Sequence, residues 1–150
     1  MSDPPLRMHA TAVAIDGHAV LLRGSPGAGK SDLALRLIDA GASLVADDQS
    51  ILTRRGDAIL VRSPQRISGL IEVRGIGIMR IATAVSEAPV LLIADLVPLD
   101  RIERLPARRR ETILGVELPL IALAPFEPSA PVKLRLVVRA FTVPGLPTML

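Results

Sequence analysis

Short apolar runs separated by glycine-containing turns fill the first part of the chain. Residues 11–15 and 19–23 flank a turn at residues 16–18, and this pattern predicts a β-hairpin. The same arrangement recurs at residues 51–54 and 58–62, with a glycine between the two runs, and predicts a second hairpin. Antiparallel strand pairs are therefore expected on both sides of residues 24–50.

Between the two hairpins, the apolar spacing changes to the helical period of 3.6 residues. Four apolar residues fall on one face of the predicted helix, and Gly41 follows where a helix would end. These four residues are Leu33, Ala34, Leu37 and Ile38. A short apolar run at residues 43–46 comes next and predicts a buried strand that ends in two aspartates.

The second half of the chain is predicted to form short secondary-structure elements, because most of the 13 prolines of the whole chain lie after residue 88. The apolar run at residues 90–96 predicts a fully buried strand. Charged and apolar residues alternate at residues 132–139, which predicts a half-exposed strand. We therefore expect an α/β fold with more strand than helix and with one or two helices.

The charge and the aromatic content narrow the range of partners. The 150 residues carry a formal net charge of +3, and the basic residues are interleaved with 15 acidic ones. There are two Phe and no Tyr or Trp, which argues against modules that stack nucleic-acid bases on aromatic rings. A few phosphates or an acidic protein suit this surface better than a nucleic acid.

No segment has the features of an exported or membrane-inserted chain. The longest apolar stretch, residues 118–126, is far shorter than the ~20 residues of a membrane span. The start of the chain lacks a signal-peptide pattern, and the absence of Cys is consistent with a reducing compartment. We expect a cytoplasmic protein that forms a single domain over residues 1–150, with a short tail at residues 1–8.

One motif dominates the sequence. It is a full match to G-x-x-x-x-G-K-[ST], formed by Gly24, Ser25, Pro26, Gly27, Ala28, Gly29, Lys30 and Ser31. Glycines let backbone N–H groups point at phosphate oxygens, and the helix that follows adds its positive end. Lys30 can reach the β- and γ-phosphates of a nucleotide, and the Ser31 hydroxyl can ligate Mg²⁺. The motif therefore predicts a nucleotide-binding P-loop.

Two carboxylates follow the predicted strand at residues 43–46. Strand ends gather around the ligand crevice of a parallel α/β sheet, so Asp47 or Asp48 is expected to face the γ-phosphate. Neighbouring residues on a strand point to opposite faces, which predicts different roles for the two side chains. One could hold Mg²⁺ while the other accepts the proton of an attacking hydroxyl.

Two further carboxylates, Asp95 and Glu72, have two interpretations each. Asp95, at the end of an apolar run, is either a metal ligand or the partner of a nearby arginine. Glu72 precedes two closely spaced glycines and either lies near the ligand or pairs with Arg74. The local pattern alone places three others on the surface, namely His9, Arg101 and Arg104.

Together these motifs resemble the bacterial HPr kinase/phosphorylase family. The matching stretches are residues 9–13, 24–31, 44–48 and 72–77, within a resemblance that covers residues 8–140. The P-loop alone is unspecific, but its combination with Val-Ala-Asp-Asp and Glu-Val-Arg-Gly-Ile-Gly is specific. The resemblance implies a P-loop kinase domain of the HPr kinase/PEP carboxykinase-like type, strand-rich with few helices.

The resemblance also implies an activity. Family members use ATP and Mg²⁺ to phosphorylate a regulatory serine of HPr, the phosphocarrier protein of the sugar phosphotransferase system, and they form hexamers. It implies that Asp48 is the proton acceptor. The implied catalytic residues are His9, Lys30, Asp48 and Arg104, with Arg101 as the alternative to Arg104. The implied metal ligands are Ser31 and Glu72, with Asp47 as their companion carboxylate. For Asp95, the resemblance favours the structural interpretation, as the partner of an arginine, over that of a metal ligand.

Two departures from the family pattern predict differences from other members, one in domain content and one in activity. Only eight residues precede His9, so we expect the family's N-terminal domain to be absent from this chain. Glu127 stands in a proline-flanked loop where the family carries arginine, so we expect weak or absent phosphorylase activity. A P-loop small-molecule kinase and a nucleotide-binding regulatory module without transfer activity remain alternatives, because no local pattern identifies the acceptor.

Overall fold

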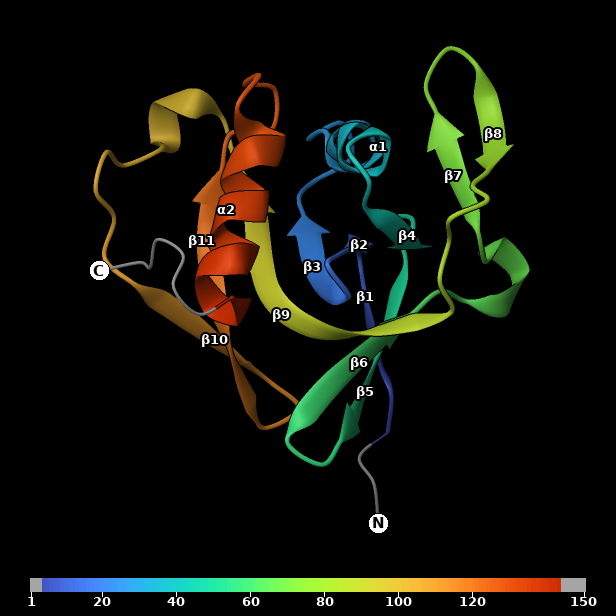
Figure 1. The fold of residues 1–150 in the computed structure, drawn as a ribbon, viewed down its shortest axis with the longest axis horizontal. Coiled ribbons are helices and arrows are strands. Elements are labelled where there is room, and N and C mark those ends of the chain that lie inside the picture. The colour runs from blue at the N-terminus through green and yellow to red at the C-terminus, as the bar shows by residue number, and fades with distance from the viewer. Residues whose placement is uncertain (1–3, 144–150) are drawn as a thin grey trace.

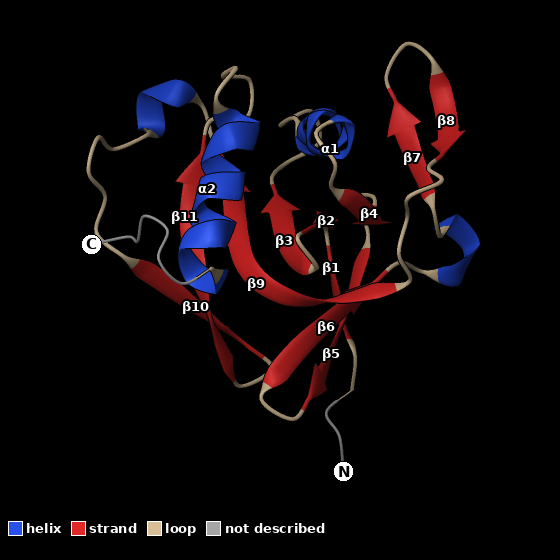
Figure 2. Cartoon of the chain, viewed as in Figure 1, coloured by secondary structure: helices blue, strands red, loops and turns tan. Residues whose placement is uncertain are grey.

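The computed structural model describes residues 4–143, which contain two α-helices and eleven strands (Figures 1 and 2). The helices are α1 (Lys30–Asp39) and α2 (Ala130–Thr142), with single 3₁₀ turns at Gln65–Ile67 and Leu99–Arg101. The strands are β1 (Leu6–Met8), β2 (Ala10–Ile15), β3 (His18–Arg23), β4 (Ser43–Ala46), β5 (Ser50–Arg55), β6 (Ala58–Arg62), β7 (Leu70–Val73), β8 (Gly77–Arg80), β9 (Glu87–Leu96), β10 (Arg109–Ile113) and β11 (Val116–Leu123). The expected strand-rich α/β architecture is confirmed.

Nine of these strands form one mixed sheet, which runs in the order β1-β5-β6-β9-β3-β2-β4 and is extended beside β9 by β11 and β10. The long strand β9 curves through the molecule (Figure 1). Its first part pairs antiparallel with β6, and its second part lies parallel between β3 and β11. Strands β7 and β8 form a separate hairpin that projects beside α1 (Figure 1).

Strand direction brings several chain segments to one edge of the sheet. Strand β2 is antiparallel to both β3 and β4, so these two strands run the same way. Strands β9 and β11 also run parallel to β3. The carboxyl ends of β3, β4, β9 and β11 therefore meet at the edge where α1 begins. The sheet is mixed, yet it gathers strand ends as a parallel sheet does.

Both faces of the central strands are buried. On β2, Val13 belongs to a core that contains Leu37 of α1 and Leu134 of α2. Its neighbour Ala12 belongs to a second core, on the other face, which contains Leu52 of β5. Strands covered on both sides have continuous apolar runs, which explains why β2 and β3 show little polar alternation.

Most predicted elements of the first half are confirmed. Both hairpins form, the predicted helix is α1, and Gly41 follows it with a φ of 106°. The tail prediction is wrong for Leu6–Met8, which pair with β5 as strand β1. Residues 1–3 lie outside the described range.

The strand predicted at residues 132–139 is wrong, because this segment lies within α2. Ala130, Leu134 and Val138 are fully buried and recur every four residues, which is a helical period. Pro131 is tolerated because it lies in the first turn. Within residues 4–143, no helix is long and apolar enough to cross a membrane.

Candidate nucleotide-binding site

The P-loop connects the end of β3 to the start of α1. Gly27 and Gly29 have φ values of 82° and 104°, in the region that favours glycine. A Cβ on Gly29 would lie 2.9 Å from a ring carbon of Phe126. The backbone conformation therefore requires glycine at position 29, and a larger residue there would also press against the ring of Phe126.

Lys30 is held inside the loop. Its side chain is 7% exposed, and its Nζ donates a hydrogen bond to the carbonyl oxygen of Gly24 at 2.7 Å. The same Nζ lies 3.3 Å from Oδ1 of Asp48. The site thus places a buried cation beside Asp48, the carboxylate that the family resemblance implies as proton acceptor.

Asp47 joins three segments of the chain. Its Oδ1 accepts hydrogen bonds from Ser31 Oγ at 2.7 Å and from Thr11 Oγ1 at 3.2 Å. Its Oδ2 accepts the backbone N–H of Glu72 at 2.9 Å. Asp47 therefore positions the start of α1, the buried strand β2 and the β7–β8 hairpin around one carboxylate.

Asp48 has a different environment. Its side chain is 60% exposed, and its φ of 62° is unusual for a residue other than glycine. Its backbone N–H donates to Thr11 Oγ1 at 3.0 Å, which holds the residue in this turn. The two aspartates therefore lie in different environments: Asp47 accepts hydrogen bonds from three chain segments, whereas Asp48 is exposed beside Lys30, and their separate roles stay predictions.

These groups line a cleft of about 540 Å³. The predicted residues that line it are Pro26, Gly27, Gly29, Lys30, Ser31, Asp47, Asp48 and Glu72. The other P-loop residues, Gly24, Ser25 and Ala28, do not line it. His9 and Arg104 are exposed and lie outside the lining, so their catalytic roles stay predictions.

Sequence reasoning missed Thr11 and several residues that line the cleft, among them Phe126 and Arg74. Thr11 is fully buried and bonds to both aspartates, and its only signal is a polar residue within an otherwise apolar strand. The alternative pairing of Glu72 with Arg74 is not found among the described residues.

Asp95 pairs with an arginine, which was the structural alternative. Arg23 Nε lies 2.7 Å from Asp95 Oδ1, and Arg23 Nη1 lies 2.6 Å from Glu111 Oε2. Hydrogen bonds to Glu111 and Asp95 raise the pKa of Arg23 above its ordinary value, so the guanidinium stays charged. Asp95 is absent from the cleft lining.

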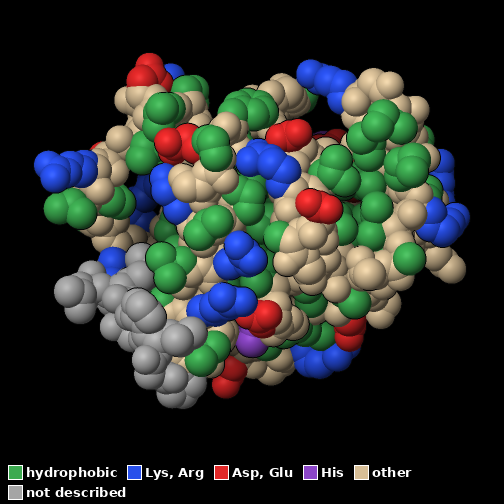
Figure 3. All heavy atoms as spheres, turned by 45° about the horizontal axis from the view of Figure 1, so that its top comes forward, with side chains coloured by type: hydrophobic (Ala, Val, Ile, Leu, Met, Phe, Trp, Pro, Cys, Tyr) green, Lys and Arg blue, Asp and Glu red, His purple; other side chains and the backbone are tan. Residues whose placement is uncertain are grey.

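Glu127 also has a partner. Its Oε1 lies 3.2 Å from Nζ of Lys133, and Glu127 does not line the cleft. Figure 3 shows acidic and basic side chains interleaved on the face it displays, rather than one large patch of either sign. The carboxylate of Glu127 therefore pairs with Lys133 of α2 and adds no negative charge to the lining of the cleft.

The donor set of the cleft is compatible with Mg²⁺. The described residues contain no group of three or more His, Cys, Asp or Glu side chains that could hold a metal on their own. Protein sites for Mg²⁺ in nucleotide enzymes often supply one or two carboxylates, and the phosphates and water supply the rest. Ser31, Asp47 and Glu72 match that limited set of oxygen donors.

Comparison with known proteins identifies the family. The sequence model described as HPr Serine kinase C-terminal domain matches residues 3–133. The chain belongs to this family. The HPr kinase/phosphorylase of Chlorobium chlorochromatii (strain CaD3) is 37% identical over 127 residues, which are 77% of this chain and 38% of that protein. That of Exiguobacterium sp. (strain ATCC BAA-1283 / AT1b) is 46% identical over 81 residues, 53% of this chain and 26% of that protein.

The family fold is confirmed by a solved structure. The Hpr(Ser) kinase/phosphatase from Coxiella burnetii superimposes with a TM-score of 0.81 at 30% identity, covering 91% of this chain and 95% of that one. Against the full lengths of the curated relatives, this chain spans less than half. The match thus concerns the C-terminal kinase domain, the region that carries the P-loop here.

Proposed function

We propose that this chain is an ATP- and Mg²⁺-dependent protein kinase that phosphorylates the regulatory serine of HPr. The observation that carries the proposal is the pair Lys30–Asp48, at 3.3 Å, within a P-loop cleft of a member of the HPr serine kinase family. A module that only binds nucleotide needs the loop but not an exposed carboxylate beside the phosphate site. The open position of Asp48 therefore favours transfer over binding alone.

In the proposed reaction, the serine hydroxyl of HPr attacks the γ-phosphorus of ATP. An oxygen–phosphorus bond forms to the serine, the bond to the β-phosphate oxygen breaks, and ADP leaves. Asp48 accepts the hydroxyl proton as the attack proceeds. Lys30 offsets the negative charge on the phosphate oxygens, and the P-loop N–H groups orient them.

The resemblance adds Arg104 as a second cation and His9 as an orienting group, and we keep both in the proposal. Ser31, Asp47 and Glu72 would hold Mg²⁺, which neutralises phosphate charge when bound. We further propose that the protein acts in the cytoplasm as a homo-oligomer, hexameric as in the family, with HPr rather than nucleic acid as its partner. Light scattering of the purified chain tests the hexamer.

A transfer assay tests the function. The purified chain is mixed with γ-labelled ATP, Mg²⁺ and HPr, and label on HPr is measured. We expect labelled HPr, and no label on an HPr variant whose regulatory serine is alanine or with the Lys30→Ala enzyme. Nucleotide binding without label on HPr would contradict the proposal and favour a small-molecule kinase or a regulatory module.

The reverse reaction is a separate question. We propose that phosphorylase activity is weak or absent, because the loop at residues 125–130 contains no arginine to bind inorganic phosphate beside phosphoserine. The assay mixes the chain with serine-phosphorylated HPr and millimolar phosphate and measures pyrophosphate. Robust pyrophosphate release would show that this loop does not control the reverse reaction.

A further inference from the structure

One aromatic ring lines the nucleotide cleft and has no part in the proposed transfer step. Phe126 lies in the loop between β11 and α2, and its side chain is 66% exposed. The chain has two Phe and no Tyr or Trp, and the other Phe, Phe141, does not line this cleft. Phe126 therefore supplies the only such ring in the cleft, and most of it is open to a ligand.

The ring lies against the P-loop. A Cβ on Gly29 would be 2.9 Å from Cζ of Phe126, and Gly29 directly precedes Lys30 at the start of α1. In Figure 1, the loop that leads into α2 lies at the same end of the molecule as α1. The base of a nucleotide whose phosphates occupy the P-loop has to lie beside that loop, where this ring is within reach.

Hydrogen bonds fix the backbone on both sides of the ring. Arg36 of α1 donates to the carbonyl oxygen of Pro125 and, at 3.4 Å, to that of Glu127, so its guanidinium holds both neighbours of Phe126. The side chain of Glu127 pairs in turn with Lys133 at 3.2 Å. An exposed ring that is already fixed through its backbone loses little freedom when a ligand stacks on it.

No other side chain of the cleft offers a comparable surface. The remaining apolar side chains of at least proline size that line it are Pro26, Leu35 and Val73, and none of them has an aromatic face. Aromatic rings bind bases by stacking, and this contact tolerates different bases because each of them has a π-face. The ring of Phe126 is therefore the best-suited surface in the cleft for a nucleotide base.

We propose that Phe126 binds the base of the nucleotide by stacking, while the phosphates occupy residues 24–31. This inference rests on the proposed function, because it requires a nucleotide in the P-loop. The ring contacts the flat face of the base and not its edge, so it adds affinity without selecting one purine over another. Phe126 is a binding residue, and it takes no part in the proton or phosphate transfer.

Calorimetric titration with ATP and with tripolyphosphate, both with Mg²⁺, tests this proposal. The two ligands carry three linked phosphates, but only ATP carries a ribose and a base. Phe126→Ala should weaken ATP by about tenfold or more and leave the affinity for tripolyphosphate unchanged. Lys30→Ala should weaken both ligands, because each places its phosphates in the P-loop.

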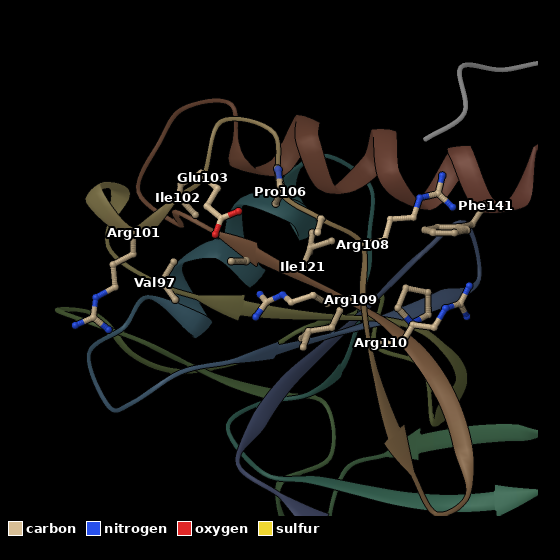
Figure 4. A pocket seen from close by; sticks show the side chains of 14 residues that line it. Val97, Arg101, Ile102, Glu103, Pro106, Arg108, Arg109, Arg110, Ile121 and Phe141 are labelled. Carbon is tan, nitrogen blue, oxygen red and sulfur yellow. The ribbon is translucent and has the colours of Figure 1, made fainter. Parts of the chain in front are cut away.

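The other phenylalanine provides the matched control. Phe141 lies near the end of α2 and lines a separate cavity of about 420 Å³ (Figure 4). None of the residues that line this cavity lines the nucleotide cleft. Phe141→Ala removes the same side chain at a distant position, and it should leave the affinities for ATP and tripolyphosphate unchanged.

Tryptophan fluorescence gives a direct readout of stacking. Because the chain has no Trp, Phe126→Trp introduces a single indole at the proposed base site. ATP should quench the fluorescence of this variant, because its base stacks on the indole, whereas tripolyphosphate should not. With Phe141→Trp, neither ligand should change the fluorescence.

The outcomes separate this inference from the proposed function. Equal affinity of ATP for the wild-type chain and for Phe126→Ala would overturn the inference and leave the kinase proposal standing. Equal weakening of ATP and tripolyphosphate in Phe126→Ala would also overturn it, because the ring would then support the P-loop and not the base. Absence of ATP binding to the wild-type chain would overturn both proposals.

Discussion

Replacement of Arg23 by methionine should destabilise the fold by removing the cation between two carboxylates. Arg23 makes four hydrogen bonds, two to Asp95 at 2.7 and 3.1 Å and two to Glu111 at 2.6 and 2.8 Å. The side chains of these three residues are 23%, 34% and 35% exposed, so water screens them only in part. Loss of one partner from a fully buried pair costs about 3–5 kcal/mol. Allowing for the partial exposure, we expect Arg23→Met to cost about 2–3 kcal/mol.

Urea unfolding, followed by circular dichroism, measures this loss, and thermal unfolding should show a Tm lower by about 4–12 °C. Arg55→Met is the matched control, because Arg55 pairs with Glu87 at 3.5 Å with side chains 70% and 41% exposed. That pair should contribute at most about 0.5 kcal/mol. Equal effects of the two substitutions would refute the structural role of Arg23. Adding Asp95→Asn to Arg23→Met should recover part of the loss, since one unpaired charge is then removed.

Three further predictions concern the nucleotide cleft. Lys30→Ala should abolish phosphate transfer with an unchanged circular dichroism spectrum, whereas Lys133→Ala, the matched surface variant, should retain transfer. Asp48→Asn should lower the transfer rate about 10²–10⁴-fold with little change in nucleotide affinity, and equal losses of both would argue against a proton acceptor. Gly29→Ala should destabilise the chain by about 1–3 kcal/mol in urea unfolding, through backbone strain and the contact with Phe126. Phe126→Ala should relieve part of that cost, and an unchanged cost in the double variant would contradict the contact.

The first half of the fold was predictable because local signals there agree with tertiary structure. At Asp16 and Gly17 the φ values are 50° and 82°, which suits the glycine-containing turn that the sequence indicates. Gly41 ends α1 for the same conformational reason. The P-loop is equally local, since its spacing and flanking elements lie within one continuous segment.

The second half was less predictable because its local patterns are ambiguous. Leu134 and Val138 satisfy both the alternation of a strand and the four-residue spacing of a helix. Only the burial of Ala130 and the packing against α1 select the helix. The sequence of β10, Arg-Arg-Glu-Thr-Ile, is largely charged and has no clear strand pattern. The segment forms a strand through its pairing with β11.

The mixed sheet also explains how Thr11, which belongs to no recognised motif, comes to lie beside the two aspartates of the site. Because β2 runs opposite to β3 and β4, the start of β2 lies beside the ends of its two neighbours. Thr11 is therefore placed where β4 passes into the two aspartates, and its hydroxyl donates to Asp47 while it accepts from the N–H of Asp48. In a purely parallel sheet, the start of a strand would lie at the opposite edge and could not supply this hydroxyl. The orientation of both carboxylates thus depends on strand direction, which no single motif along the chain encodes.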